Sequence, residues 1–420
     1  MASNLKKIVS LYNSTSLIAR IVVGLIIGLV LGLVCPGAQW VALLGDLFVG
    51  ALKAIAPVLV FALVSSALVQ GQEKLDNRFA LVLALYLVST LLAAVVAVIG
   101  SFMFPQTLVL NVAAADQAAP SGIGEVLRNL LLNMVANPLS SIIEGKYIGI
   151  LFWAVCFGLV MKNIAAETTK RFMGDVADGI SALVRHIINL APFGIMGLVF
   201  TNVSGNGLAI FTDYGKLLVL LVGCMLAVAL IVDPLIAFIV LRRNPYPLVL
   251  RCLRQSGITA FFTRSSAANI PVNMELCEEL GLDKEMYSVS IPLGATINMD
   301  GAAITISVMT LAAANTVGIH VDIPSALLLS FLSALAACGA SGVAGGSLLL
   351  IPMACSMFGI SNDVAMQVVA IGFIIGVVQD SVETALNSSG DVMFAATAEY
   401  AQWLKEGREL PAFMGGRKGK

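Results

Sequence analysis

Charged residues are scarce in this sequence, and the two signs nearly cancel. Only 12% of the residues are Asp, Glu, Lys or Arg, against 59% hydrophobic residues, whereas soluble domains carry about 25% charged residues. The formal net charge is −1, so the chain has no basic field that would attract a nucleic acid. The composition excludes an ordinary soluble domain and a nucleic-acid partner, and it predicts an all-α polytopic protein whose surroundings are the lipid bilayer.

The signatures of metal centres and of common enzymes are also missing. None of the seven cysteines forms a CxxC pair, so we expect free thiols and neither a zinc site nor a disulfide framework. The sequence has no HExxH, no GxxxxGK[ST] and no GxSxG motif, which are the marks of zinc proteases, P-loop nucleotide hydrolases and serine hydrolases. We therefore do not expect an enzyme.

Long apolar runs fill most of the chain, and each is near the ~20 residues that a bilayer crossing needs. Lys and Arg gather on alternate loops, and the loops at 36–40 and 315–324 contain neither, so the positive-inside rule predicts that both termini are cytoplasmic. Eight transmembrane helices are expected, at about 16–35, 41–69, 79–104, 147–166, 183–203, 214–241, 287–314 and 361–398.

Two further segments fit no span. In 326–358, two apolar arms flank a glycine-rich stretch at 339–347, and an arm of about 13 helical residues reaches only about 20 Å of a 30 Å core. We interpret it as a re-entrant hairpin, the second hairpin, whose tip lies at membrane depth; a short external loop between tilted helices is the alternative.

The other segment, 247–285, carries small polar residues around Arg264. It is either another re-entrant hairpin, the first hairpin, or a cytoplasmic amphipathic loop. A hairpin followed by a polar-interrupted helix would occur at 247–314 and again at 323–398, from opposite faces. This layout favours an inverted repeat with a binding site between its halves near the midplane.

Asp300 lies in the middle of an expected span. A carboxylate at bilayer depth costs about 3 kcal/mol and persists where it faces a cavity, a partner charge or a bound ion. Gly294 and Gly301 bracket Thr296 and Asn298, so the helix can unwind here and turn carbonyl groups toward a cation. The alternative is a kinked, buried helix in which Asp300 pairs with a neighbour.

The last span carries a polar stripe made by Asp380, Glu383, Thr384, Asn387 and Asp391, whose spacing places them on one helical face. Arg264 is the only basic residue expected nearby, so the remaining carboxylates call for a substrate ammonium and for bound Na⁺ or H⁺, which prefer oxygen ligands. A purely structural polar face is the alternative. A paired-aspartate protease would leave the hairpins unexplained.

These segments resemble the dicarboxylate/amino acid:cation symporter family, which has the glutamate-transporter fold. The resemblance covers nearly the whole chain and rests on Thr263-Arg264-Ser265-Ser266, on Leu293-Gly-Ala-Thr-Ile-Asn-Met-Asp-Gly301, on the glycine-rich tip at 339–346 and on Asn387-Ser-Ser-Gly-Asp391. Within the family, the chain looks most like bacterial members that carry serine and threonine with sodium.

The resemblance implies eight spans, two re-entrant hairpins, a homotrimer in the bacterial inner membrane and an elevator motion. Residues 1–246 would mainly form the scaffold, with the third span and the fourth–fifth region contributing partly to the transport domain. Residues 247–404 would form the core transport domain and 405–420 a cytoplasmic tail.

The resemblance also implies three sites for co-transported Na⁺ and one site for substrate. The first sodium site would use Gly294, Asn298, Asn387 and Asp391; the deep sodium site Tyr86, Ser89, Thr90, Asn298 and Asp300; and the third Thr296, Ala337, Cys338 and Ala340. The substrate would lie against Ser265, Ser266, Val343, Asp380, Glu383, Thr384 and Asn387, with its ammonium on Asp380.

One departure from the family bears on the substrate. Members that carry acidic substrates have an arginine where this chain has Glu383, and a neighbouring threonine is Ala302 here. A second carboxylate would meet a like charge, so small neutral amino acids are expected, serine and threonine above all. An amino-acid-gated channel or sensor, proton coupling and dicarboxylate transport by the same fold remain open alternatives.

Overall fold

The computed structural model describes residues 15–70, 77–110, 128, 131–338, 340 and 345–415. This part of the chain consists of helices and connecting loops, without a β-strand. In chain order the helices are α2 (Leu17–Val34), α3 (Trp40–Val69), α4 (Asn77–Met103), α6 (Pro138–Glu144), α7 (Tyr147–Ile164), α8 (Glu167–Asn189), α9 (Ala191–Asn206), η1 (Gly207–Ala209), α10 (Ile210–Ala227), η2 (Val228–Val232), α11 (Asp233–Leu241), α12 (Tyr246–Cys252), η3 (Leu253–Gly257), α13 (Ile258–Thr263), α14 (Ser266–Glu279), α15 (Lys284–Ile297), α16 (Asp300–Thr316), α17 (Ile323–Ala337), η4 (Ser347–Leu350), α18 (Ile351–Met357), α19 (Asn362–Lys405) and η5 (Ala412–Met414).

Many of these helices are long and apolar enough to cross a bilayer. Among the described residues 6 spans qualify, or up to 7 if the bent pair α8–α9 counts as one span. Large apolar side chains such as Trp40, Val219 and Ile231 are exposed on the outer helices, as expected where lipid replaces water. The protein is therefore a polytopic membrane protein.

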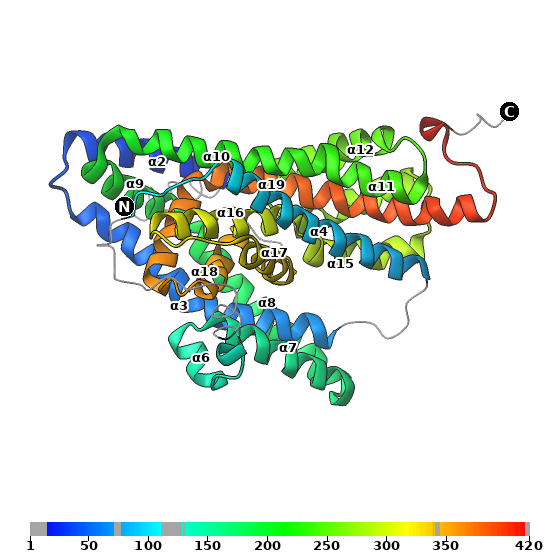
Figure 1. Ribbon diagram of the computed structural model, residues 1–420, viewed down its shortest axis with the longest axis horizontal. Helices are drawn as coiled ribbons and strands as arrows, with labels where there is room; N and C mark the ends of the chain where they lie inside the picture. Colours follow the sequence, from blue (N-terminus) through cyan, green and yellow to red (C-terminus); the bar gives the residue numbers. More distant parts are fainter. Residues whose placement is uncertain are drawn as a thin grey trace, which may run out of the picture.

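Two helical segments form the centre of the bundle. In the segment formed by α15 and α16, 94% of the most apolar window is buried, and in α19 83%, against 39–50% in the other spans. Figure 1 shows α16 and α19 running through the middle of the molecule, with α2, α10 and α11 along one side. These central helices carry the polar residues that the sequence singled out.

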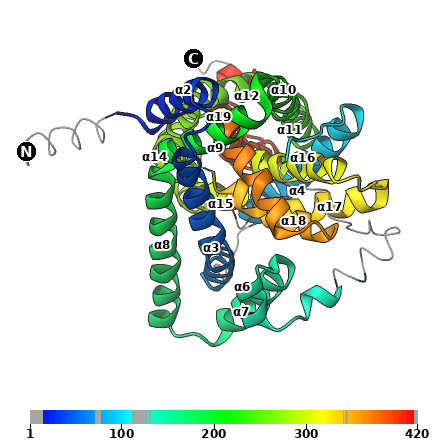
Figure 2. The same cartoon turned by 90° about the vertical axis from the view of Figure 1, so that its left-hand side faces the viewer.

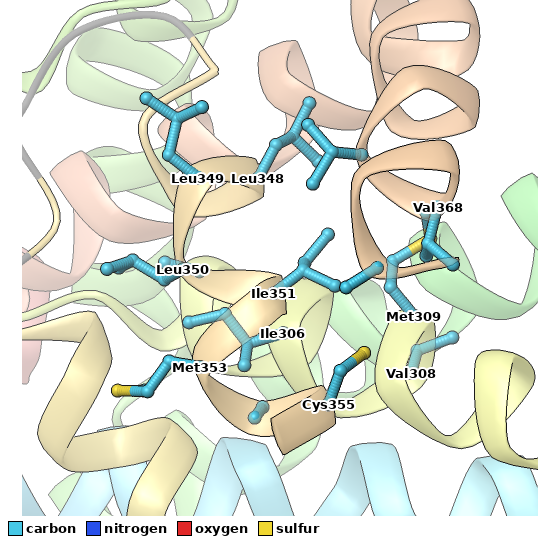
Figure 3. Close-up of a cluster of buried hydrophobic side chains, with 14 of the residues drawn as sticks. Ile306, Val308, Met309, Leu348, Leu349, Leu350, Ile351, Met353, Cys355 and Val368 are labelled. Atoms are coloured by element: carbon cyan, nitrogen blue, oxygen red, sulfur yellow. The ribbon is translucent and has the colours of Figure 1, made fainter. Parts of the chain in front are cut away.

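The second hairpin packs against this centre through apolar side chains. Figure 3 shows Leu348 and Ile351 of its returning arm beside Ile306 and Met309 of α16 and Val368 of α19, and all five are buried. Its outgoing arm is α17, and its returning arm is η4 followed by α18. Gly339 and residues 341–344, including Val343, lie outside the described residues.

The first hairpin also has two helical arms. Its outgoing arm runs through α12, η3 and α13 and stops at Arg264, which has φ +53°. Its returning arm is α14, and Ser265 caps it by accepting a hydrogen bond from the Ala268 N–H.

The predicted span at 183–203 is wrong as a single helix. The chain bends by 53° between α8 and α9, and Pro192 directly follows the bend. Proline has no N–H and its ring clashes with the carbonyl of the residue four positions earlier, so α8 cannot continue through it. Figure 2 shows α8 as a separate long helix beside α3.

The last span is a continuous helix, as its polar stripe on one helical face requires. α19 runs unbroken for 44 residues, and several of its small polar side chains bond back to their own helix. The hydroxyls of Ser381, Thr384 and Ser389 donate to the carbonyls of Val377, Asp380 and Ala385 at 2.8, 2.7 and 2.7 Å. The interruption of the 287–314 span is present, between Ile297 and Asp300.

Candidate functional site

The break between α15 and α16 is held by α19. Asn298 ends α15 with φ −90° and ψ 80°, and its Nδ2 donates to the Asn387 carbonyl at 3.1 Å and to Asp391 Oδ1 at 3.0 Å. The Gly301 N–H, in the first turn of α16, donates to Asn387 Oδ1 at 2.8 Å. Backbone groups that the break releases are thus bonded by side chains of the polar stripe.

The two glycines beside this break allow the helices to approach. A Cβ on Gly294 would lie 2.7 Å from Asp391 Oδ1 and 2.9 Å from the Tyr86 hydroxyl, and a Cβ on Gly301 would lie 2.8 Å from Glu383 Cα. The Glu383 backbone cannot yield easily, so position 301 requires glycine; a side chain at position 294 would displace the Asp391 carboxylate and the Tyr86 hydroxyl.

Asp300 is fully buried and faces α4. Its Oδ1 accepts a hydrogen bond from Thr90 Oγ1 at 2.8 Å, and its Oδ2 lies 2.7 Å from Ser89 Oγ. Ser89 and Thr90, which the family resemblance grouped with Asp300, therefore do lie beside it. Tyr86, one turn earlier on the same face of α4, donates to the Asp391 carbonyl at 3.0 Å.

The structure adds an acidic residue that the sequence analysis missed. Asp233 Oδ1 also lies 2.7 Å from Ser89 Oγ, and Asp233 is 2% exposed. The sequence contains a sign of this residue, because Asp233 is an acidic residue within the apolar run at 214–241, just as Asp300 is within the run at 287–314.

Two oxygens of this polar core lack partners. Asn298 Oδ1 and Asp391 Oδ2 are buried and form no hydrogen bond with any described residue. Leaving a buried polar oxygen unsatisfied costs about 1–3 kcal/mol, and more for a charged group. Carboxylate and amide oxygens are the ligands of hard cations, so these two side chains fit a bound alkali ion.

Asp380 joins the two hairpins. Its Oδ2 accepts from Arg264 Nε of the first hairpin at 2.7 Å, and its Oδ1 accepts from the Gly345 N–H of the second at 3.1 Å. Arg264 is buried, and its Nη1 finds no acceptor among the described residues. One guanidinium nitrogen is therefore still able to donate to a carboxylate at this point.

Glu383 faces the protein interior. Its Oε2 accepts hydrogen bonds from Thr305 of α16 at 2.7 Å and from Ser347 of η4 at 2.9 Å, and Gln379 also donates to it. This oxygen is saturated by protein donors, and it ties the returning arm of the second hairpin to α16 and α19.

The other predicted residues lie at the edges of this core. Ser266 is buried, and Ser265 caps α14. Cys338 Sγ lies 3.5 Å from the Ile297 carbonyl, so the ends of α17 and α15 meet. Thr296 Oγ1 bonds back to the Leu293 carbonyl at 2.7 Å, and Ala337 and Ala340 are buried.

The core does not have the composition of a transition-metal centre. Among the described residues, no three His, Cys, Asp or Glu side chains gather in a way that could hold a metal ion. Its polar groups are instead carboxylates, amides and hydroxyls, the oxygen donors that alkali ions prefer.

Comparisons with known proteins agree with this chemistry. Relatives named "Serine/threonine transporter SstT" are 67% identical in Bifidobacterium adolescentis, over 98% of this chain and 96% of the relative, and 61% identical in Streptococcus agalactiae, over 96% and 100%. A relative of the same name in Streptococcus thermophilus is 57% identical over 96% and 100%. The model of the sodium:dicarboxylate symporter family, whose members are transporters and not enzymes, matches residues 17–400. With its pair of helical hairpins and its buried oxygen-rich core, the chain belongs to the sodium:dicarboxylate symporter family.

Proposed function

We propose that the protein is a sodium-coupled symporter that takes up small neutral amino acids, serine and threonine foremost. The observation that carries this proposal is the pair of buried, unpartnered oxygens Asn298 Oδ1 and Asp391 Oδ2. They lie on adjoining side chains between α15 and α19, where a cation would supply the missing partner. The names of the relatives support serine and threonine as the cargo.

Three sodium sites are proposed, as the family resemblance implies. Asp391 and Asn298 would serve the first sodium site with the carbonyls of Gly294 and Asn387. Asp300, Ser89, Thr90, Tyr86 and Asn298 would serve the deep sodium site. Backbone groups of Thr296, Ala337, Cys338 and Ala340 would serve the third, and the contact of Cys338 with the Ile297 carbonyl is in keeping with it.

The substrate would bind between the two hairpins. Its ammonium would interact with Asp380 and its carboxylate with Ser266 and the second hairpin around Val343, beside Ser265, Thr384 and Asn387. Arg264 already contacts Asp380 at 2.7 Å, so a substrate ammonium would share this carboxylate with the guanidinium. Glu383 would then disfavour acidic side chains through its charge, although its Oε2 is held by protein donors.

The same resemblance supplies the proposed architecture. Eight spans and two re-entrant hairpins would form a homotrimer in the bacterial inner membrane, with both termini cytoplasmic. Residues 247–404 would move as an elevator against a scaffold built mainly from 1–246.

Uptake into proteoliposomes tests the proposal. One sodium ion moving down 100 mV yields about 2.3 kcal/mol, enough for roughly fifty-fold concentration of substrate. We expect an inward sodium gradient to drive accumulation of labelled serine, unlabelled threonine to compete with it, and aspartate to compete poorly. Equilibration without accumulation would contradict symport and favour a channel, and strong competition by aspartate would contradict the role of Glu383.

A further inference from the structure

Asp233 is buried although the residues two positions to either side of it are exposed. Ile231 and Leu235 are 63% and 53% exposed, whereas Asp233 is 2% exposed. A carboxylate at this depth is costly unless it meets a compensating group. None of the three proposed sodium sites and none of the family motifs above assigns Asp233 a role.

The backbone around Asp233 departs from a regular helix. A π-helical turn, η2, comes directly before it, so that the Asp233 N–H bonds to the Val228 carbonyl five residues earlier. Pro234, which follows, has no N–H to offer the Leu230 carbonyl, and the Tyr246 hydroxyl donates to that carbonyl instead at 2.9 Å. Single π turns inside α-helices often occur at functional sites.

The contacts of Ser89 leave Asp233 and Asp300 short of positive charge. Ser89 Oγ lies 2.7 Å from Asp233 Oδ1 and 2.7 Å from Asp300 Oδ2, but a hydroxyl carries one proton and can donate to only one of them. With both carboxyl groups ionised, the other carboxylate faces a hydroxyl oxygen with no proton between them. A cation beside Ser89 would remove this repulsion, because it would draw on both carboxylates and on the lone pairs of the hydroxyl.

A second observation points to the same place. Asn298 is fully buried two residues before Asp300, and its Oδ1 has no partner among the described residues. Asp391 Oδ2 is also buried without a partner, and the Asp391 carbonyl is bonded to Tyr86, which lies one turn from Ser89. One unpartnered oxygen thus belongs to the residue two positions before Asp300, and the other belongs to a residue whose carbonyl is bonded to α4, the helix that also bonds Asp300.

We propose that Asp233 is a further ligand of the deep sodium site, contributed by the helix formed by α10, η2 and α11. The inference rests on the proposed function and extends it, because the site then holds two carboxylates in place of the one that the family resemblance implies. The second carboxylate raises the affinity of the site for sodium. It also brings a second negative charge beside Ser89, and a bound sodium ion offsets that charge.

Sodium binding to the purified protein, in detergent and without amino acid, tests this inference. The readouts are binding of labelled sodium and the sodium-dependent rise in melting temperature, with choline as the comparison ion. We expect Asp233→Asn to weaken sodium binding about tenfold or more, because one of two charged ligands is lost. The same variant should melt at a higher temperature than wild type in choline, because the repulsion between the two carboxylates is gone.

Asp213→Asn is the matched control, because Asp213 lies on α10 but is paired with Lys216 at the surface. It should leave both readouts unchanged. Asp233→Glu keeps the charge and should retain most of the sodium response, which separates loss of a ligand from loss of folding. A sodium titration of Asp233→Asn that superimposes on wild type, while that of Asp300→Asn is shifted, would overturn the inference. If neither variant is shifted, the proposed sodium coupling at this site fails as well.

Discussion

The four carboxylates that the sequence analysis singled out are all buried, but their partners differ. Asp380 is paired with a guanidinium, Glu383 Oε2 accepts hydrogen bonds from three uncharged donors, Asp300 is bonded by hydroxyls, and Asp391 keeps one oxygen without a partner. Spacing on a helix predicts that such residues share a face, but it does not tell which neighbour each one meets. Ser89 of α4 shows this, because it lies in a mostly apolar helix and its significance comes from its contact with Asp300.

The role of Asp380 can be separated from that of Arg264. Asp380→Asn removes a charge-assisted hydrogen bond worth about 1.5–3 kcal/mol, so serine affinity should fall on the order of ten- to a hundred-fold. It also leaves the buried Arg264 without its counter-charge. The double variant Asp380→Asn with Arg264→Gln removes both charges and should recover thermal stability but not serine affinity.

Calorimetry of serine binding together with a melting curve provides both measurements. Wild-type serine affinity in the double variant would mean that Asp380 only balances Arg264 and that the ammonium binds elsewhere.

At the scale of elements, some helix breaks could be predicted from the sequence and others could not. The break in the 287–314 span follows from Gly294, Asn298 and Gly301, and the structure contains it. The bend before Pro192 was not predicted, because a long apolar run conceals a proline kink. The single helical face of the polar stripe in α19 was predicted from its spacing, and α19 is continuous through it. The sequence analysis missed Asp233 because the residues around it form no recognisable polar motif.

The returning arm of the second hairpin depends on one glycine. Gly345 has φ +74°, its N–H donates to Asp380, and a Cβ there would lie 2.9 Å from Phe373. Gly345→Ala should therefore strain the arm by roughly 1–2 kcal/mol and lower serine affinity several-fold, as measured by calorimetry. Gly407→Ala is the control, because Gly407 also has φ +74° but no atom lies within 4 Å of the added Cβ.

The control should lower stability slightly and leave serine affinity intact. Equal serine affinity in the two variants would show that the Gly345 arm does not take part in binding.

At the scale of the whole molecule, composition alone predicts a polytopic helical protein, because 59% hydrophobic residues cannot be buried in a soluble domain of this size. The number of spans is harder to obtain. α19 at 44 residues would reach about 66 Å along its axis, roughly twice the hydrocarbon core, and α8 is long but amphipathic. The length and hydropathy of a helix therefore do not tell how many times the chain crosses the membrane.

The central claim is that sodium and amino acid bind as one linked process through the buried oxygens of the polar core. Linkage requires that each ligand raise the affinity for the other by the same factor. The most direct measurement is calorimetric serine binding to purified protein at a series of sodium concentrations, repeated in choline and with Asp391→Asn. We predict that the serine dissociation constant falls steeply as sodium rises, stays weak in choline and loses much of its sodium dependence in Asp391→Asn. Equal serine affinity in sodium and in choline would contradict the account.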